Sequence, residues 1–306
     1  MSDNKNAFNS RLILNIGLAV VVLMLVLVVV FEPGKAPPPE KVRLTSLKQD
    51  DIKQIHIKRN KQADIVLEKR GPVWFMLKPY HLAANDFRAK SIMQLAEAES
   101  HLQYDTASID LAKFDLKTAT TSVTFNNTLT LEMGNSDPLQ RRRYVRNGNT
   151  LHLITDNLYY NIIATPTSFL SYQLLPPDSK FSKLELPNFT MQLEQGRWTV
   201  TPTPKDLSAD SITELLNEWR HAQALEIEEY EGPAKKGQFK IHLQGQDSPI
   251  GFSYTREEDD HYLIRHDLKL RYKISEEIAK NLQELPPPPE PLPETTAEDL
   301  NTGTRK

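Results

Sequence analysis

One apolar segment near the N-terminus limits what this chain can be. Residues 12–31 are twenty consecutive positions without a charged side chain, and Asn15 is the one strongly polar residue among them. A helix of that length rises roughly 30 Å, which matches the hydrocarbon core of a bilayer. The segment therefore predicts a single-pass transmembrane helix, followed by a body that is polar enough to be soluble.

A cleaved signal peptide is the alternative explanation for this segment. The apolar region of a signal peptide is usually about 7 to 15 residues long and is followed by small residues at a cleavage site. Residues 31–35 (Phe-Glu-Pro-Gly-Lys) contain no such site, so we expect the anchor to be retained. Arg11 precedes the span and Glu32 follows it, which favours a cytoplasmic N-terminus. We expect residues 1–11 to form a cytoplasmic head at the inner membrane, with the body in the periplasm.

The composition excludes several classes of function. The net charge is -3, which leaves too little positive charge to predict a nucleic-acid partner. The chain has no cysteine, so it forms neither disulfides nor thiolate metal sites. Its 11 glycines form neither GxGxxG nor GxxxxGK[ST], the loops that hold nucleotide phosphates. We therefore expect no cofactor.

Two proline-rich segments flank the body. Residues 32–43 predict a semi-rigid spacer, and residues 286–306 predict a disordered tail because they carry almost no large apolar side chain. Between them lies a faint internal repeat, in which Trp74 to Asp86 and Trp198 to Asp210 have the same spacing. We expect a first repeat unit over residues 44–177 and a second over residues 178–285.

The repeat predicts the fold class. Each unit resembles a β-β-α pattern followed by further antiparallel strands and a short closing helix, which indicates an α+β fold of two related units with mainly antiparallel sheets. Asn147-Gly148 predicts a tight hairpin. The first helix is expected to open at Asn85-Asp86 and the second at Asp210, with a Ser211 and Glu214 capping box. The first helical pattern continues through Ile92, Leu95, Ala96 and Leu102, and the expected core includes Trp74, Trp198, Leu102, Leu116, Ile212, Leu215 and Leu216.

A series of short motifs carries a family resemblance. They are Leu67-x-Lys69, Trp74, Pro79, Ala84-Asn85-Asp86, residues 111–116 (Leu-Ala-Lys-Phe-Asp-Leu) and Tyr144-Val145-Arg146. Their order resembles the bacterial domain-of-unknown-function 4340 family, although Asp115 stands where a glycine is usual and the second unit lacks the 111–116 motif. The resemblance implies one membrane span, one or more copies of the unit, and genes beside auxiliary components of gliding-type ABC transporters. It implies no catalytic residues.

No motif for catalysis or metal binding stands out. The sequence contains no GxSxG, the motif that places a serine nucleophile. The densest set of metal-ligand types is Asp259, Asp260, His261, His266 and Asp267. Histidines five apart in one strand point to opposite faces, so we expect a solvated turn there and no metal.

An arginine cluster is the candidate interaction patch. Arg141, Arg142, Arg143 and Arg146 would suit anionic lipid head groups or a carboxylate-rich partner. The alternative is a hairpin edge whose charges prevent edge-to-edge pairing. The corresponding turn of the second unit, residues 257–260 (Glu-Glu-Asp-Asp), has the opposite sign, so the two turns are hypothesised to attract each other weakly.

These features favour a non-enzymatic, membrane-anchored binding or assembly module of the bacterial envelope. Its expected partners are membrane lipid, through residues 12–31, and envelope proteins, among them ABC-transporter-like components. One alternative is an anchored hydrolase with a scattered active site, marked by a cleft with perturbed carboxylates or histidines. Another is an accessory subunit of an ABC-type transporter, marked by a deep apolar pocket between the units. The sequence identifies neither a ligand nor an oligomeric state.

Overall fold

A computed structural model describes residues 16–27, 42–137, 140–233 and 238–287. The chain divides into two compact parts, Met1–Val42 and Arg43–Lys306. In the first part, residues 16–27 are helical. The other residues of the predicted span lie outside the described residues, as do the head and most of the spacer and tail. Among the described residues, no helix combines the length and the apolar character that a bilayer crossing requires.

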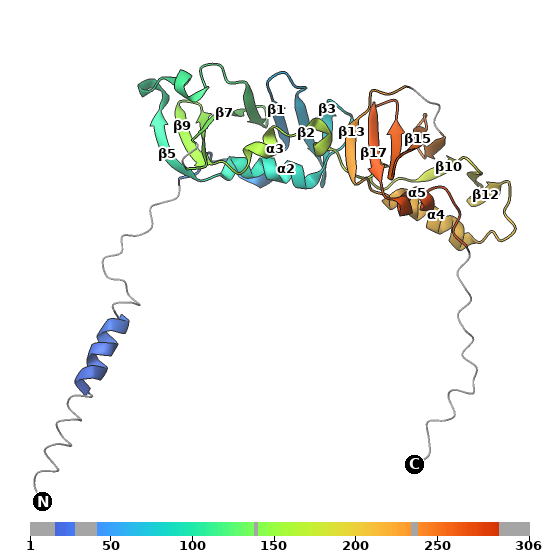
Figure 1. Ribbon diagram of the computed structural model, residues 1–306, viewed down its shortest axis with the longest axis horizontal. Helices are drawn as coiled ribbons and strands as arrows, with labels where there is room; N and C mark the ends of the chain where they lie inside the picture. The colour runs from blue at the N-terminus through green and yellow to red at the C-terminus, as the bar shows by residue number, and fades with distance from the viewer. Residues whose placement is uncertain (1–15, 28–41, 138–139, 234–237, 288–306) are drawn as a thin grey trace, which may run out of the picture. The chain divides into compact units, whose positions relative to one another are not determined.

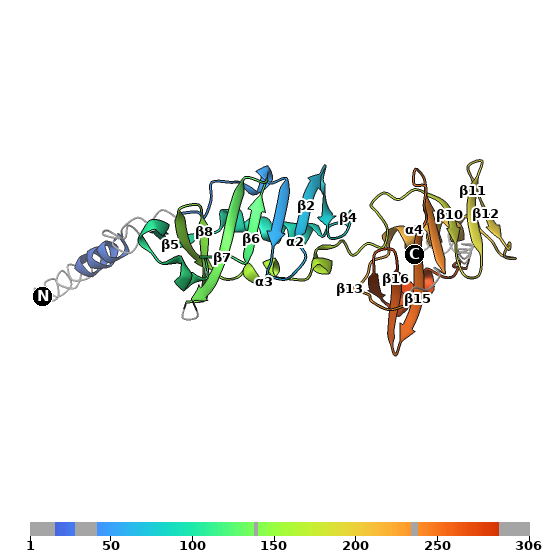
Figure 2. The same ribbon diagram turned by 90° about the horizontal axis from the view of Figure 1, so that it is seen from above.

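The first sheet contains nine antiparallel strands. Their order is β4-β3-β2-β1-β6-β7-β8-β9-β5, so β4 and β5 are its edges (Figures 1 and 2). The strands are β1 (Gln54–Lys58), β2 (Ile65–Arg70), β3 (Val73–Lys78), β4 (Leu82–Ala83), β5 (Ser100–Asp105), β6 (Thr121–Phe125), β7 (Leu129–Asp137), β8 (Arg142–Asn147) and β9 (Thr150–Thr155).

Short helices cover one face of this sheet, which is called the inner face here. They are η1 (Gln49–Asp51), α2 (Asp86–Met93), η2 (Gln94–Glu97), α3 (Tyr159–Ile162) and η5 (Pro166–Phe169). Figure 1 shows α2 and α3 along the same side of the strands. Asn85 caps α2, because its side chain accepts hydrogen bonds from the backbone N–H groups of Phe87 and Arg88. The helix therefore opens where the sequence predicts.

The second sheet contains eight antiparallel strands in the order β12-β11-β10-β14-β15-β16-β17-β13. The strands are β10 (Phe181–Glu185), β11 (Thr190–Glu194), β12 (Arg197–Thr201), β13 (Glu226–Glu229), β14 (Phe239–Leu243), β15 (Ile250–Glu257), β16 (Asp260–Arg265) and β17 (Leu270–Ile274). Two antiparallel sheets with a few helices agree with the predicted α+β class.

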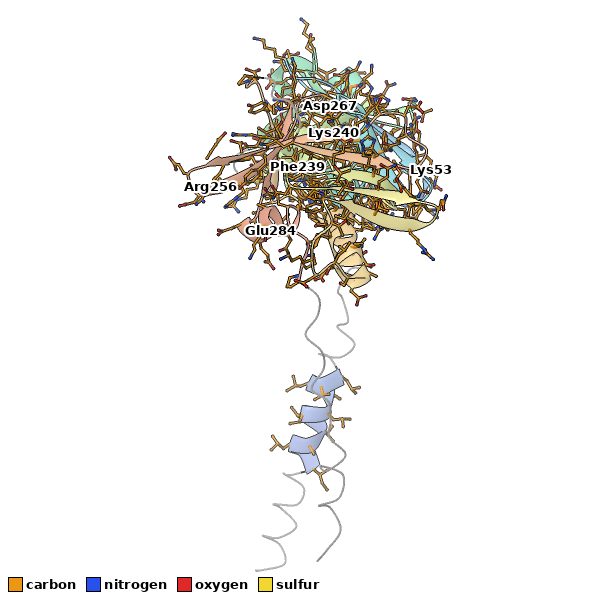
Figure 3. All side chains as sticks on the ribbon, turned by 90° about the vertical axis from the view of Figure 1, so that its right-hand side faces the viewer. Lys53, Phe239, Lys240, Arg256, Asp267 and Glu284 are labelled. Carbon is orange, nitrogen blue, oxygen red and sulfur yellow. The ribbon has the colours of Figure 1, made fainter. Side chains whose placement is uncertain are left out.

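Helices α4 (Ala209–His221) and α5 (Glu276–Asn281) accompany the second sheet. The cap of α4 is Ser208, whose hydroxyl accepts from the backbone N–H of Ser211, so the predicted capping box at Ser211 and Glu214 is wrong. Trp219 of α4 packs against Phe239 with ring centroids 5.7 Å apart. Figure 3 shows Phe239 in the interior of the body and Arg256 at its periphery, and Phe239 is 1% exposed.

The two sheets have the same strand order once β4 is set aside. β3-β2-β1 corresponds to β12-β11-β10, and β6-β7-β8-β9-β5 corresponds to β14-β15-β16-β17-β13. Trp74 and Trp198 occupy matching positions in β3 and β12, although Trp74 is buried and Trp198 is only partly buried. The boundaries at residues 177 and 285 stay predictions.

The segment between the two sheets is packed into the body. Leu174 and Leu175 are buried, and the backbone N–H of Leu174 donates to the carbonyl of Ala222 at 3.1 Å. Gln173 forms an isolated antiparallel bridge with Gln223. These contacts tie the segment to the chain that leads from α4 into β13.

Candidate functional site

Strand β5 is an exposed sheet edge with apolar side chains. Residues 101–105 (His-Leu-Gln-Tyr-Asp), which we call the β5 edge, are all exposed, and Leu102 and Tyr104 remain 45% and 42% accessible. The sequence pattern predicts Leu102 on a helix and in the core, and both predictions are wrong. The helical pattern ends with η2, and the alternation of polar and apolar residues from His101 to Asp105 has the period of a strand. That alternation was the signal that could have found β5.

An apolar row crosses the outer face of the first sheet toward this edge. Leu102 pairs with Leu153, which pairs in turn with Tyr144 of β8. Because directly opposed residues in antiparallel strands point to the same face, their side chains adjoin one another. Tyr104 lies opposite Leu151 in the same way. Leu151 and Leu153 are buried, whereas Leu102 and Tyr104 at the end of the rows are not.

The segment from Thr106 to Leu116 packs against part of this outer face. It contains η3 (Thr106–Ser108) and η4 (Leu111–Phe114), each capped by an aspartate that precedes it. The Phe114 ring lies 4.5 Å from the Tyr144 ring, and Leu116 is fully buried. Burial of the Tyr144 hydroxyl, together with Asp137 and Tyr104, raises the pKa of Tyr144. The 111–116 motif is thus a cover for apolar side chains beside the β5 edge.

A buried serine–histidine pair supports β5 from its inner face. The Ser100 hydroxyl donates to the carbonyl of Leu102 at 3.0 Å and lies 3.0 Å from Nδ1 of His152. Because the hydroxyl hydrogen points to the carbonyl, Nδ1 of His152 is the donor to Ser100. Burial lowers the pKa of His152, which keeps the ring neutral. The pair fixes the position of Leu102 and is closed to solvent.

The structure distributes the predicted arginine patch over both faces of β8. Arg143 points to the inner face, where it forms two hydrogen bonds with Asp156 and stacks over Tyr159 at 3.4 Å. Arg146 points to the outer face and pairs with Glu132. Arg142 donates to Gln140, and Arg141 is exposed with a φ of 51°. Arg143 and Arg146 are therefore each paired with a carboxylate of the same chain. The role of the cluster in partner binding stays a prediction.

The acidic turn of the second unit also has partners on its own sheet. Asp260 pairs with Lys273 at 2.7 Å, and Glu257 pairs with Arg271 at 3.3 Å. The Asp260 pair joins the neighbouring strands β16 and β17, whereas Glu257 of β15 pairs with Arg271 across β16. The hypothesised attraction between the arginine turn and the acidic turn stays a prediction.

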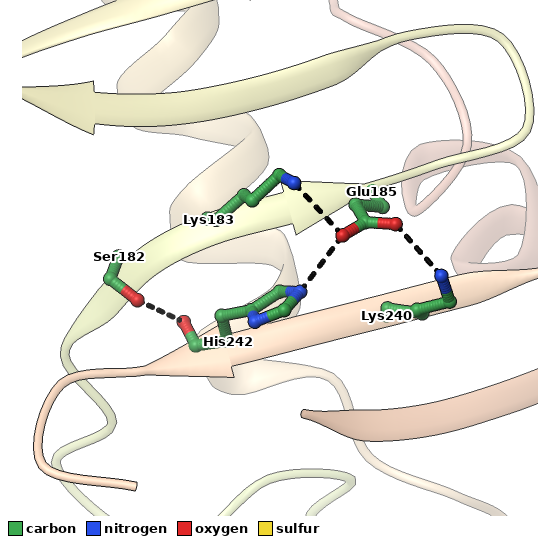
Figure 4. A network of polar contacts seen from close by, with 5 residues as sticks. All are labelled: Ser182, Lys183, Glu185, Lys240 and His242. Atoms are coloured by element: carbon green, nitrogen blue, oxygen red, sulfur yellow. Dashed lines mark hydrogen bonds and ion pairs between the residues drawn. The ribbon is translucent and has the colours of Figure 1, made fainter. Parts of the chain in front are cut away.

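A polar network covers the outer face of the second sheet (Figure 4). The Glu185 carboxylate accepts from Lys183, Lys240 and His242, each at 3.0 Å. The lysine hydrogen bonds, with a smaller contribution from His242, lower the pKa of Glu185 to about 2. This network joins β10 to β14 through the Glu185 carboxylate.

A cavity of about 540 Å³ lies where the chain before β4 meets the end of β13. Across it, the Tyr80 hydroxyl donates to Glu229 at 2.9 Å, and burial and this bond raise the pKa of Tyr80. His266 and Lys269 also line the cavity. Its lining combines polar and apolar surface in about equal parts, whereas the pocket expected of a transporter accessory is mostly apolar.

The metal-ligand types singled out in the sequence are dispersed. His261 lies 2.7 Å from the Tyr254 hydroxyl, and His266 lies 3.0 Å from the Ser253 hydroxyl. Asp267 forms two hydrogen bonds with Arg265. Within the described ranges, no group of three or more histidine, cysteine, aspartate or glutamate side chains could hold a metal ion.

Comparison with known proteins identifies one family. The sequence model of a family described as a domain of unknown function (DUF4340) matches residues 74–240, a range that begins in β3 of the first sheet and ends in β14 of the second. Neither the curated proteins nor the solved structures contain a match to the chain.

Proposed function

The chain belongs to the family of the domain of unknown function (DUF4340), and from this premise we propose that it is a non-enzymatic binding or assembly module, anchored in the bacterial inner membrane with its body in the periplasm. The observation that carries the proposal is the β5 edge. It exposes Leu102 and Tyr104 on an edge strand, and an unpaired strand edge is a template for another strand. We assign partner binding to this edge by strand addition.

The anchoring part of the proposal comes from the sequence. Residues 12–31 are apolar over a length that suits a bilayer, and their described part, residues 16–27, is helical and exposes its apolar side chains. Arg11 and Glu32 at the two ends of the span favour a cytoplasmic N-terminus. The partners in this proposal are envelope proteins, with ABC-transporter-like components as the first candidates.

The non-enzymatic part of the proposal is supported by two contacts between a serine hydroxyl and a histidine ring, Ser100 with His152 and Ser253 with His266. Ser100 directs its hydroxyl hydrogen to the Leu102 carbonyl, so His152 is not placed to take that proton as a general base would. Ser253 is 2% exposed, which closes its hydroxyl to a substrate. Neither contact therefore has the access and hydrogen-bond direction that an acyl-transfer nucleophile needs.

A site-specific crosslinking experiment tests the proposal. The full-length chain is produced in bacterial membranes with a photoreactive amino acid at position 104 or, as the matched control, at position 160. Tyr160 is an exposed tyrosine on α3, outside any strand. We expect discrete protein adducts from position 104 that are absent from position 160 and that disappear when Leu102→Lys is added.

Two outcomes would contradict the proposal. The first is the absence of any position-specific adduct at 104 together with turnover of an envelope substrate by the purified chain. The second concerns the anchor, because a mature chain recovered from the soluble fraction without roughly its first thirty residues would be a processed export product. Carbonate extraction of the membranes, followed by mass measurement of the mature chain, separates these cases.

A further inference from the structure

The four strand edges of the two sheets differ in how they are protected. β4 is two residues long, β13 carries three glutamates in four residues, and the apolar residues of β12 are at least partly buried. Short strands and charges are the usual devices that prevent edge-to-edge pairing. Among the strands that the structure describes, β5 is the edge that exposes large apolar side chains.

The backbone of β5 also has hydrogen-bonding groups available at its free side. Thr106 donates its N–H to the carbonyl of Asn149, the residue before β9, in register with the pairing of Tyr104 with Leu151. Because alternate residues of a strand direct their N–H and C=O groups to opposite sides, Gln103 directs both groups away from β9. A register shift between Ser100 and Leu102 marks the start of the regular edge, and η3 follows its end.

The residues of this edge are complementary to themselves in reverse order. If Gln103 faces Gln103 of an antiparallel copy, Leu102 faces Tyr104 of that copy, and Tyr104 faces its Leu102. The flanking His101 then lies toward Asp105 of the copy, so an imidazole that can donate meets a carboxylate. A two-fold axis through Gln103 satisfies both strands with the same contacts, as an isologous interface requires.

We propose that the β5 edge binds the β5 edge of a second copy of this chain, antiparallel and with Gln103 opposite Gln103, so that two nine-stranded sheets join into one. The inference rests on the proposed function, since it names the partner of the same edge. The ladder is short, and cross-strand pairs contribute only about 0.2–1 kcal/mol each. Pairing therefore depends on both copies being confined to one membrane, which raises their effective concentration.

The chain's own spacer is the competing occupant of this edge. Arg43 bridges Glu99 in an antiparallel sense, and the same register continued backwards would set Lys41 beside His101, Pro39 beside Gln103 and Pro37 beside Asp105. Proline has no backbone N–H, so Pro39 and Pro37 could not donate to the carbonyls of these two residues. A second β5 strand supplies the donor that the spacer lacks at both positions.

A cysteine introduced at position 103 tests the pairing, and the natural chain has no cysteine to interfere. In a hydrogen-bonded antiparallel pair the opposed Cα atoms are about 5.5 Å apart, which lies inside the range that a disulfide spans. The full-length Gln103→Cys chain is oxidised in membranes and its disulfide-linked dimer is quantified. The matched controls are Thr199→Cys, exposed on edge strand β12, and Leu225→Cys, exposed outside any strand. We expect about tenfold more dimer for Gln103→Cys than for either control, because pairing holds the two thiols together.

Two further variants decide between the occupants. Gln103→Pro removes the outward N–H at an edge position that tolerates proline, so we expect it to abolish crosslinking of copies through a photoreactive residue at position 104. Pro39→Cys with Gln103→Cys should give no disulfide within one chain. An intramolecular disulfide there, or equal dimer yields from Gln103→Cys and its controls, would overturn self-pairing. If position 104 then crosslinks another protein, the proposed function survives, whereas absence of every adduct defeats both.

Discussion

Asp115 occupies a backbone conformation that favours glycine. It ends η4 with a φ of 57°, and the N–H of the next residue, Leu116, donates to the carbonyl of Leu111. L-residues other than glycine, asparagine and aspartate are strongly disfavoured in this region because of their Cβ atom. The glycine that the family resemblance implies at this position would therefore have a physical reason, and aspartate is one of the few tolerated substitutes.

Asp115→Gly should stabilise the body. Relief of the left-handed strain outweighs the added freedom of the unfolded chain, so we expect the free energy of unfolding to rise by about 0.5–1 kcal/mol. Urea denaturation of the full-length chain in detergent measures the difference. Lys117→Gly is the control, because Lys117 is exposed and has a negative φ, and it should lower stability. A decrease for Asp115→Gly as well would show that the aspartate side chain matters more than its φ.

Arg143 is structural in this fold, although the sequence placed it in an interaction patch. Its side chain is 12% exposed, binds Asp156 with two hydrogen bonds and donates to the carbonyl of Gly134. Arg143→Ala leaves the Asp156 carboxylate without this partner, so we expect a loss of about 2 kcal/mol of unfolding free energy. Arg141→Ala, at an exposed position, should change it by less than about 0.5 kcal/mol. If both variants lost equally little unfolding free energy in denaturant titrations, Arg143 would have no structural role and would again be a candidate for the interaction patch.

The sequence contained the information that divides the arginine cluster. Residues of a strand alternate between faces, so Arg142 and Arg146 must lie opposite Arg143 once β8 is assigned as a strand. Asp156 as the partner of Arg143 could not be deduced in the same way. The two residues meet because β8 pairs with β9 and the chain then turns back toward α3, which is a property of the tertiary fold.

At the scale of elements, hairpins and helix starts followed from local signals. The tight hairpin predicted from Asn147-Gly148 forms, with Gly148 and Asn149 as the two residues between β8 and β9, and Asn85 caps α2. Strand β5 was not predicted from local signals. Ile92, Leu95 and Ala96 continue a helical spacing almost up to the strand, and the break at η2 is short. Period-two alternation over residues 101–105 competes with a longer helical pattern there, and the strand prevails through its pairing with β9.

The two units protect their outer faces by different means. In the first, Phe114 covers Tyr144, and the 111–116 motif supplies the cover. In the second, which lacks that motif, Glu228 pairs with Arg271 at 2.6 Å on the corresponding strands β13 and β17. Charged side chains can face solvent without a covering segment. The charged residues of β13 therefore explain why the second sheet folds without a counterpart of the 111–116 motif. This difference also explains why self-pairing is assigned to β5 and not to β13.

The network that joins β10 to β14 should make stability depend on pH. The folded-state pKa of Glu185 is about 2, below its ordinary value of 4.5, so its contribution is fully present above about pH 4.5 and is lost as the pH falls toward 2. Since the carboxylate is partly solvated, we expect a loss of about 1 kcal/mol. Denaturant titrations between pH 2 and 6 measure it. The loss at low pH should be smaller in Glu185→Gln. It should be unchanged in Glu194→Gln, because Glu194 is an exposed residue of β11. If the unfolding free energy of the natural chain and both variants fell equally with pH, Glu185 would not be the group responsible.

At the scale of the whole body, the connection between the sheets is a packed element. Leu174 and Leu175 belong to the same cluster of buried residues as Trp74 of the first sheet and Trp219 of α4. The N–H of Ala224 donates to the carbonyl of Tyr172, which continues the bridge between Gln173 and Gln223. The sequence predicted a boundary between the repeat units after residue 177, and Leu174 and Leu175 give the segment before it an apolar side that a loose linker would not have.

Because this connection is packed, the two sheets should lose stability together. Leu174→Ala removes a fully buried side chain, so we expect the opening free energy of the central strands β1 and β14 to fall by the same amount, about 2–3 kcal/mol. Hydrogen exchange with mass spectrometry on the full-length chain reads both strands in one experiment. Leu225→Ala, whose side chain is 62% exposed, is the matched control and should leave both unchanged. If only β14 loses protection, the halves are independent domains, and a partner bound at the β5 edge would have no route through the packed core to the second sheet.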